Sequence, residues 1–223
     1  MSGPLLFIAA DPREFAGFLP RWQQAQPLEL PVHWARNGRW KGREVVAIAN
    51  GAGADRAFAA VLVAPRPSAI CSIGFCGALD ESLHLADVVV VTVVHSGGDS
   101  WFTAPFHSPE ARNGALASID HIAQTAAEKR NLRATGALIV EMEAAGVARA
   151  AEDLAVPFYC VRAVSDLARE DLANDFNAAL KPDGRFSILH LLRQGHPGEL
   201  LQLQRRTADA AKKLGGFLNA SSF

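Results

Sequence analysis

Residues 136–166 read GALIVEMEAAGVARAAEDLAVPFYCVRAVSD, and the order of segments within this stretch predicts the fold. The apolar run at residues 137–140 is typical of a buried strand. Residues 144–154 are rich in good helix formers, which predicts an amphipathic helix. Residues 158–164 form a second apolar run. Two strands joined by one helix predict a βαβ crossover, with both strands parallel in one sheet.

Acidic residues follow both predicted strands. Glu141 and Glu143 flank Met142 directly after the first strand, and Ser165 and Asp166 end the second. Because open α/β sheets bind ligands beyond the C-terminal ends of their strands, we expect the three carboxylates to gather in one binding site. The local pattern also allows Ser165 and Asp166 simply to cap a following polar helix, which we expect at residues 167–180.

The composition indicates one globular α/β domain spanning residues 1–223. Hydrophobic residues make up 49% of the chain and charged residues 20%, which is enough apolar material for a large core. The net charge is −1, without basic blocks, so we expect no nucleic-acid partner. The longest apolar runs, such as residues 88–94, are too short to span a membrane, and residues 5–10 are too short for a signal peptide.

The chain has three cysteines, Cys71, Cys76 and Cys160, in strand-like or glycine-rich surroundings. An odd number of such cysteines predicts buried free thiols in a reducing compartment, and we therefore expect a cytoplasmic protein. Cys71 and Cys76 have no nearby cysteine or histidine pair, so we expect no metal site.

Two segments, VEMEAA at residues 140–145 and VRAVSDLA at residues 161–168, resemble the paired signature of the nucleoside phosphorylase and nucleosidase superfamily. That superfamily includes purine and uridine phosphorylases and methylthioadenosine/S-adenosylhomocysteine nucleosidases. The resemblance implies a three-layer α/β/α fold with a central mixed, partly closed sheet. It also implies an enzyme that cleaves the N-ribosidic bond of an adenosine-type purine nucleoside without a cofactor. Family members generally oligomerise, so we expect a homo-oligomer of two or more subunits.

The resemblance assigns a role to each residue of the paired signature. Asp166 would protonate the purine ring, and Ser165 would hold Asp166 in place. Glu143 would accept hydrogen bonds from the ribose hydroxyls, and Met142 would form the apolar floor beneath the sugar. For Glu141, contact with the substrate and a supporting role both remain open. Arg162 is expected to pair with one of these carboxylates.

The segment after the first predicted strand, residues 5–10, holds two further candidates. Asp11 and Pro12 favour the start of a helix, whose first turn would contain Glu14. By the resemblance, Glu14 would activate the attacking water of a nucleosidase. Arg13 competes with it, because some phosphorylases place a phosphate-binding arginine in this loop.

Two glycine-rich segments follow predicted strands. Gly51 and Gly53 come after the strand at residues 45–49, where they permit either a tight turn or an anion site built from free N–H groups. In the superfamily this loop borders the ribose or phosphate pocket. The second segment, residues 74–79, includes Gly77 and resembles the glycine-rich turn of the family.

The second glycine-rich segment departs from the phosphorylase pattern. Many bacterial purine phosphorylases have an arginine in place of Ser72 and a serine in place of Phe75, and both bind phosphate. Phe75 cannot hydrogen-bond phosphate, so it would be a core residue or an apolar wall of the pocket. Ile122 replaces the aromatic ring that commonly packs against the base.

These departures leave the acceptor open. Residues 127–132 and 181–185 resemble the hopanoid-associated phosphorylases, which favours phosphorolysis, with phosphate as co-substrate and a bulky apolar 5′ group on the nucleoside. Glu14 and the altered phosphate pattern favour hydrolysis, as in methylthioadenosine/S-adenosylhomocysteine or futalosine nucleosidases. A nucleoside-binding protein without activity is a third alternative, although a binder does not need a general acid beside the base.

Overall fold

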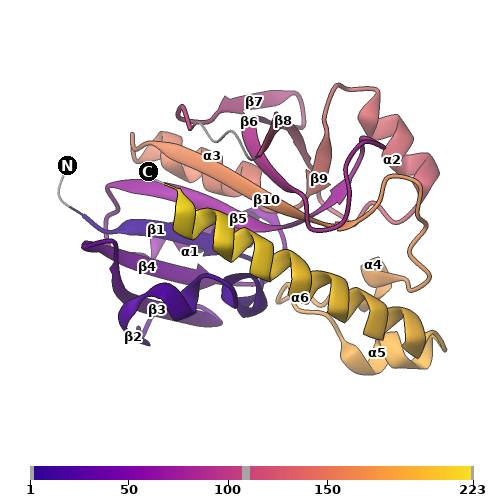
Figure 1. The fold of residues 1–223 in the computed structure, drawn as a ribbon, viewed down its shortest axis with the longest axis horizontal. Helices are drawn as coiled ribbons and strands as arrows, with labels where there is room; N and C mark the ends of the chain where they lie inside the picture. The colour runs from indigo at the N-terminus through magenta and orange to yellow at the C-terminus, as the bar shows by residue number, and fades with distance from the viewer. Residues whose placement is uncertain (1–2, 107–110, 222–223) are drawn as a thin grey trace.

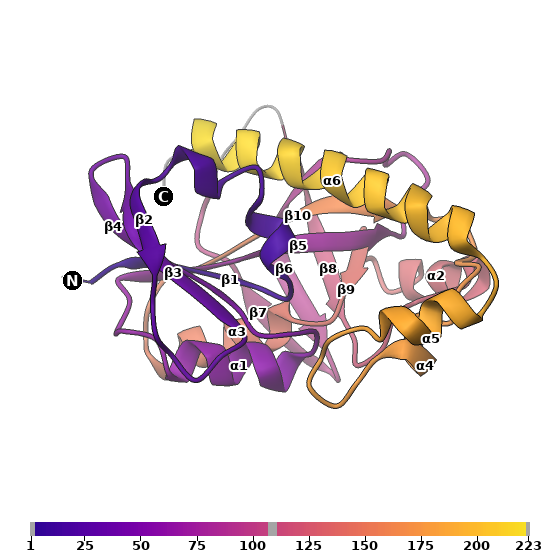
Figure 2. The same cartoon turned by 90° about the horizontal axis from the view of Figure 1, so that it is seen from below.

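The structure is a computed structural model that describes residues 3–106 and 111–221. A mixed β-sheet forms its centre and helices cover both faces, so that the layers are helix, sheet and helix (Figures 1 and 2). In Figure 2, α6 (Pro197–Ala220) lies above the sheet, and α1 (Ala54–Leu62) and α3 (Ala144–Asp153) lie below it. None of the helices in the described ranges is long and apolar enough to cross a membrane.

The sheet closes partly on itself. Its strand order is β10 (Phe158–Asp166), β6 (Val88–Ser96), β8 (Arg112–Ser118), β9 (Ile139–Glu141), β5 (Ala69–Ala78), β1 (Leu5–Ala9), β4 (Arg43–Ala49), β3 (Trp34–Trp40) and β2 (Gln23–Pro27). A short strand, β7 (Asp99–Phe102), pairs with β6. Because β10 pairs with β5 as well as with β6, the strands from β10 to β5 form a ring. The predicted mixed, partly closed sheet is confirmed.

The remaining helices are short and lie at one end of the molecule (Figure 1). They are α2 (Ala126–Arg133), α4 (Phe176–Ala179) and α5 (Ile188–Arg193). Two 3₁₀ helices, Pro12–Phe15 and Leu19–Arg21, follow β1.

Alternation along the central strand β1 separates the core into two layers. All five residues of β1 are buried, as expected for a strand with helices on both sides. Leu6 and Ile8 belong to the cluster that packs against α1 and α3. Leu5 and Phe7 belong to the opposite cluster, which includes Leu214 of α6. The three cysteines are buried and free, as predicted.

The predicted parallel crossover between residues 137–140 and 158–164 is wrong. β9 and β10 are joined by α3, but β5 lies between them, antiparallel to β9 and parallel to β10. The two strands therefore run in opposite directions. β9 has only three residues, and its direction is fixed by pairing with β5 and β8 rather than by the helix that follows it.

Two other predictions of local structure are wrong. Residues 74–78 continue β5 as strand instead of forming a turn, because β10 pairs with β5 from residue 70 to residue 77. Residues 167–180, predicted as a helix, contain only the short α4, preceded by irregular chain. Backbone hydrogen bonds to distant segments, such as Leu172 N to Gln124 O at 2.8 Å, stabilise this irregular chain.

A close approach between α6 and the chain after β1 depends on glycine. A Cβ atom on Gly215 would lie 2.0 Å from the backbone carbon of Gly17, whereas a Cβ atom on Gly216 would meet nothing within 4 Å. We therefore expect Gly215→Ala to destabilise the protein by about 1–3 kcal/mol, since the clash is with backbone and overpacking costs this much. Gly216→Ala, the matched control in the same helix, should stabilise it by about 0.5–1 kcal/mol. Denaturant unfolding of both variants tests this packing, and equal effects of the two substitutions would contradict it.

Candidate active site

Four carboxylates meet near β5. Glu14 comes from the 3₁₀ helix after β1, Glu141 ends β9, Glu143 immediately precedes α3, and Asp166 ends β10. Each of these residues is less than a tenth exposed. Buried carboxylates in such numbers are costly unless they are paired, hydrogen-bonded or protonated, so their partners determine what the site can do.

Arg162 pairs with one of the four carboxylates, as expected. This arginine of β10 is fully buried, and its Nη2 lies 2.5 Å from Glu141 Oε2 and 2.8 Å from Ser72 Oγ. Glu141 also accepts the backbone N–H groups of Glu143 and Ala144 at 3.0 and 2.9 Å. Glu141 therefore supports the start of α3, and its contact with a substrate stays a prediction.

Glu14 is held by backbone donors from the chain just after β1 and from β5. Its Oε2 accepts the N–H groups of Ala10 and Asp11 at 2.8 and 2.9 Å, and its Oε1 accepts that of Phe75 at 2.8 Å. Burial raises the pKa of Glu14 to about 7, although these hydrogen bonds oppose the rise. A Cβ atom on Gly74 would lie 2.6 Å from Glu14 Oε1, so only glycine leaves room for this carboxylate. A carboxylate with such a pKa is suited to accept a proton at neutral pH.

Glu143 faces the loop between β4 and α1. Its Oε1 accepts the N–H group of Gly53 at 3.0 Å. Burial, together with the charges of Glu141 and Glu14, raises the pKa of Glu143 to about 8. Met142, beside it, lines a cavity of about 350 Å³ that Gly53 and Ser118 also line. Met142 therefore lies at a cavity, and Glu143 is hydrogen-bonded to Gly53, a residue of the same lining; the contact of both residues with a sugar stays a prediction.

Asp166 has a partner on each oxygen. Ser165 Oγ lies 2.9 Å from Asp166 Oδ2 and 3.2 Å from Cys76 O, and Lys129 Nζ of α2 forms an ion pair with Oδ1. A Cβ atom on Gly77 would lie 2.9 Å from Asp166 Oδ1, which explains the glycine at this point of β5. Ser165 and Asp166 therefore belong to β10 and to this site, and do not cap a helix.

Lys129 is the site residue that the sequence analysis missed. It is fully buried, although α2 is predominantly polar. One signal was present: Ala126 and Leu132 lie three residues before and after Lys129, which places it on the apolar face of the helix. A lysine on that face requires either an extended path to solvent or a buried partner.

Three predicted residues lie apart from the carboxylates. The Arg13 side chain is 63% exposed and pairs with Asp11 at 2.8 Å. Ile122 exchanges backbone hydrogen bonds with the Asn177 side chain at 2.8 and 3.0 Å and packs in the cluster that contains Phe176. The side chain of Phe75 packs in the core beside α6, so that only its backbone N–H reaches Glu14.

The backbone N–H groups of residues 51–53 donate hydrogen bonds within the protein. The N–H group of Gly51 donates to Ala10 O at 2.9 Å, and that of Ala52 donates to Gly184 O at 2.8 Å. The N–H group of Gly53 donates to Glu143. The N–H groups of residues 51–53 are therefore bonded within the protein in a tight turn that supports a carboxylate, and an anion at these groups would have to displace their partners.

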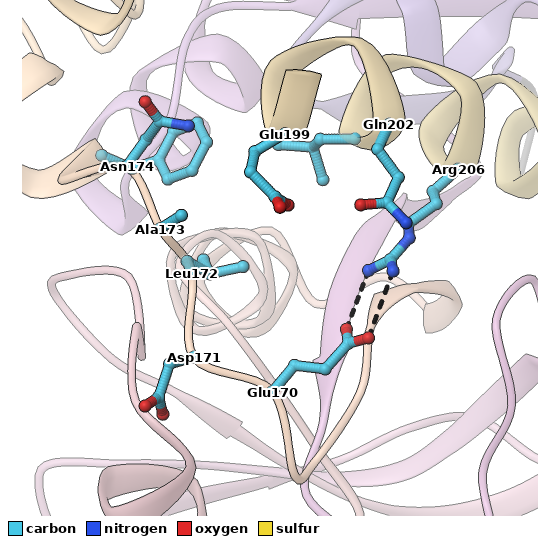
Figure 3. A pocket seen from close by; sticks show the side chains of 10 residues that line it. Glu170, Asp171, Leu172, Ala173, Asn174, Glu199, Gln202 and Arg206 are labelled. Carbon is cyan, nitrogen blue, oxygen red and sulfur yellow. Dashed lines mark hydrogen bonds and ion pairs between the residues drawn. The ribbon is translucent and has the colours of Figure 1, made fainter. Parts of the chain in front are cut away.

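A second cavity, of about 360 Å³, contains none of the predicted residues (Figure 3). It lies between the irregular chain after β10 and α6. Arg206 of α6 donates two hydrogen bonds to the carboxylate of Glu170, at 2.8 and 3.1 Å, across one side of it. This pair attaches the chain that follows Asp166 to α6.

Comparison with known proteins agrees with this fold. The profile of the phosphorylase superfamily matches residues 4–119 and 103–183. The 5′-methylthioadenosine/S-adenosylhomocysteine nucleosidase of Staphylococcus aureus is 29% identical over 177 residues, which cover 65% of this chain and 78% of that protein. Since the profile covers more than half of the chain, the protein belongs to the phosphorylase superfamily, and the predicted membership of this superfamily of enzymes is confirmed.

Solved structures with a similar fold also include 5′-methylthioadenosine/S-adenosylhomocysteine nucleosidases. The nucleosidase from S. pneumoniae with the transition-state inhibitor MT-ImmA has a TM-score of 0.73 at 18% identity and covers 97% of both chains. The nucleosidase from Helicobacter pylori with butyl-thio-DADMe-Immucillin-A has a TM-score of 0.72 at 17% identity and covers 99% of both chains. At these identities the likeness shows a shared fold. Homo-oligomer formation and a cytoplasmic location stay predictions.

The raised pKa of Glu143 predicts how stability depends on pH. Between its ordinary value of 4.5 and about 8, the folded protein holds a proton that the unfolded chain has released, so stability falls as the pH rises through this window. Glu143→Gln removes this loss. We expect the melting temperature of the variant, relative to wild type, to rise from pH 5 to pH 8.5 by at least about 2–4 °C, which corresponds to about 1 kcal/mol for a chain of this size.

The matched control for this prediction is Glu44→Gln, which removes an exposed carboxylate of β4. Its melting temperature should follow that of the wild type at each pH. A difference between Glu143→Gln and wild type that is the same at pH 5 and pH 8.5 would contradict the assigned burial of the charge.

Proposed function

We propose that the protein is a nucleosidase that hydrolyses the N-ribosidic bond of adenosine-type nucleosides, in the manner of the 5′-methylthioadenosine/S-adenosylhomocysteine nucleosidases. The observation that carries this proposal is the environment of Glu14. Its carboxylate is buried, aligned by three backbone N–H groups, and has a pKa of about 7. Such a group is suited to take a proton from water at neutral pH.

The surroundings of Glu14 favour water over phosphate as the acceptor. The guanidinium of Arg13 pairs with Asp11 on the surface, and the N–H groups at Gly51 and Gly53 have partners within the protein. A phosphate dianion here would meet Glu14 and Glu143 without these donors. Like charges at close range in a buried site raise the free energy of such a complex.

Departure of the base requires a proton, which we assign to Asp166. As the bond between C1′ and the ring nitrogen breaks, its electron pair leaves with the base, and the base nitrogen takes the proton of the Asp166 carboxyl group. Water bonds to C1′ and gives a proton to Glu14. Asp166 ends as a carboxylate and Glu14 as a carboxyl group, so the proton returns from Glu14 to Asp166 through solvent before the next turnover.

Glu143 stabilises the sugar in this proposal. Its Oε1 is hydrogen-bonded to Gly53, which lines the same cavity as Met142, and in the proposed complex Glu143 accepts hydrogen bonds from the ribose hydroxyls. A sugar that develops positive charge favours the ionised form of Glu143, so the interaction strengthens in the transition state. The 5′ group of the substrate stays open between the methylthio or homocysteine groups handled by the relatives and the bulky apolar group expected from the sequence.

The proposal is tested by measuring adenine release from adenosine, 5′-methylthioadenosine and a 5′-alkyl adenosine, each with and without phosphate. We expect release that does not depend on phosphate, and Asp166→Asn should lower kcat by about 10²–10⁴-fold, the usual loss for a general acid. Release only with phosphate would establish a phosphorylase. Adenine binding without turnover would establish a binding protein.

The pKa of Glu14 predicts an acid limb in the pH profile. Because the ionised carboxylate accepts the proton of water, kcat/KM should fall about tenfold for each pH unit below about 7. Glu14→Gln should remove most activity at every pH while the protein stays folded, as circular dichroism can show. Full activity of wild type at pH 5 would exclude Glu14 as the base.

A further inference from the structure

Lys129 is a buried cation that the proposed reaction has not yet used. Its side chain is 1% exposed, and its Nζ contacts Asp166 Oδ1, Leu167 O at 2.8 Å and Glu170 O at 3.4 Å. An ammonium group has three hydrogens to donate, so these acceptors account for all of them. Asp166 is the carboxylate among these acceptors, and the charge of Lys129 therefore acts there.

The carboxylate of Glu170, which also belongs to this part of the chain, is hydrogen-bonded to residues other than Lys129. The Glu170 carboxylate accepts Arg206 Nη1 and Nη2 at 2.8 and 3.1 Å and the N–H group of Leu167 at 3.2 Å. Lys129 reaches only the backbone carbonyl of Glu170. Two cations therefore attach this part of the chain. Arg206 binds the carboxylate of Glu170, and Lys129 binds the carboxylate of Asp166 at the end of β10.

We propose that Lys129 is a positioning residue for the acid Asp166, and this inference rests on the proposed function. With Ser165 on one oxygen and Lys129 on the other, the carboxyl group of Asp166 is fixed in orientation before the base arrives. When the proton passes to the base, the carboxylate left behind lies against an ammonium group in a buried site. That contact favours the carboxylate that proton transfer leaves behind, so it assists bond breaking more than substrate binding.

The variant Lys129→Gln tests the charge of Lys129 separately from its attachment of the chain at residues 167–170. Lys129→Gln can still donate to the carbonyls of Leu167 and Glu170 but carries no charge. We expect kcat to fall about 10–100-fold while KM changes less than about threefold, since the lost interaction belongs to the transition state. Lys129→Met, of similar length and without polar atoms, serves if the glutamine variant does not fold, and should show the same loss.

The matched control is Arg206→Gln, which weakens the other attachment of the same chain segment without touching Asp166. We expect kcat within about threefold of wild type, and a melting temperature lowered at least as much as in the lysine variant. An equal loss of kcat in both variants would overturn the inference, because loop attachment alone would then explain the effect of Lys129.

A double-mutant cycle with Asp166→Asn supplies the second readout. If Lys129 acts through Asp166, adding Lys129→Gln to Asp166→Asn should lower kcat by less than about threefold further. A further loss as large as in the wild-type background would overturn the inference while leaving the proposed function intact. If Asp166→Asn is as active as wild type, or wild type releases no base, the proposed function itself fails and the inference fails with it.

Discussion

The site depends on one buried guanidinium. Arg162 lies in the middle of β10, opposite Gly74 of β5 and Val89 of β6, and its side chain reaches Glu141 of β9 and Ser72 of β5. It therefore joins the strands that close the sheet and neutralises the carboxylate that begins α3. Removing one partner of such a pair leaves an uncompensated buried charge, which costs more than the pair contributes. The fold and the arrangement of the carboxylates thus depend on the same contact.

Glycine provides the space for the other carboxylates. At two positions of β5, Gly74 and Gly77, an added Cβ atom would come within 3.0 Å of an oxygen of Glu14 or Asp166. A glycine-rich strand is normally weakened by its lack of side chains, and it often marks a close approach. Here pairing with β10 and β9 maintains the strand, and the missing side chains become the space in which the acid and the base lie.

Local patterns in the sequence predicted where helices and strands occur better than they predicted which segments pair with one another. The helix predicted at residues 144–154, the strands predicted at residues 5–10 and 45–49, and the helix start predicted at Asp11 depend on neighbouring residues and are found in the structure. The direction of β9 and the extension of β5 through Gly77 depend on strands far away in the sequence, which periodicity does not specify. Lys129 was missed for the same reason, since its partner lies 37 residues away.

The charges of the site also bear on the acceptor. If all four buried carboxylates were ionised, Arg162 and Lys129 would balance only two of them. Burial raises the pKa values of Glu14 and Glu143, which means that the burial of their charged forms is not fully compensated. A sugar that becomes cationic during bond cleavage relieves this cost, because it restores the charge of Glu143 in the presence of an opposite charge. A phosphate dianion would add negative charge and so increase the cost of burying these carboxylates. In the proposed reaction, electrostatics therefore favours a neutral acceptor, and water is the neutral acceptor that Glu14 would activate.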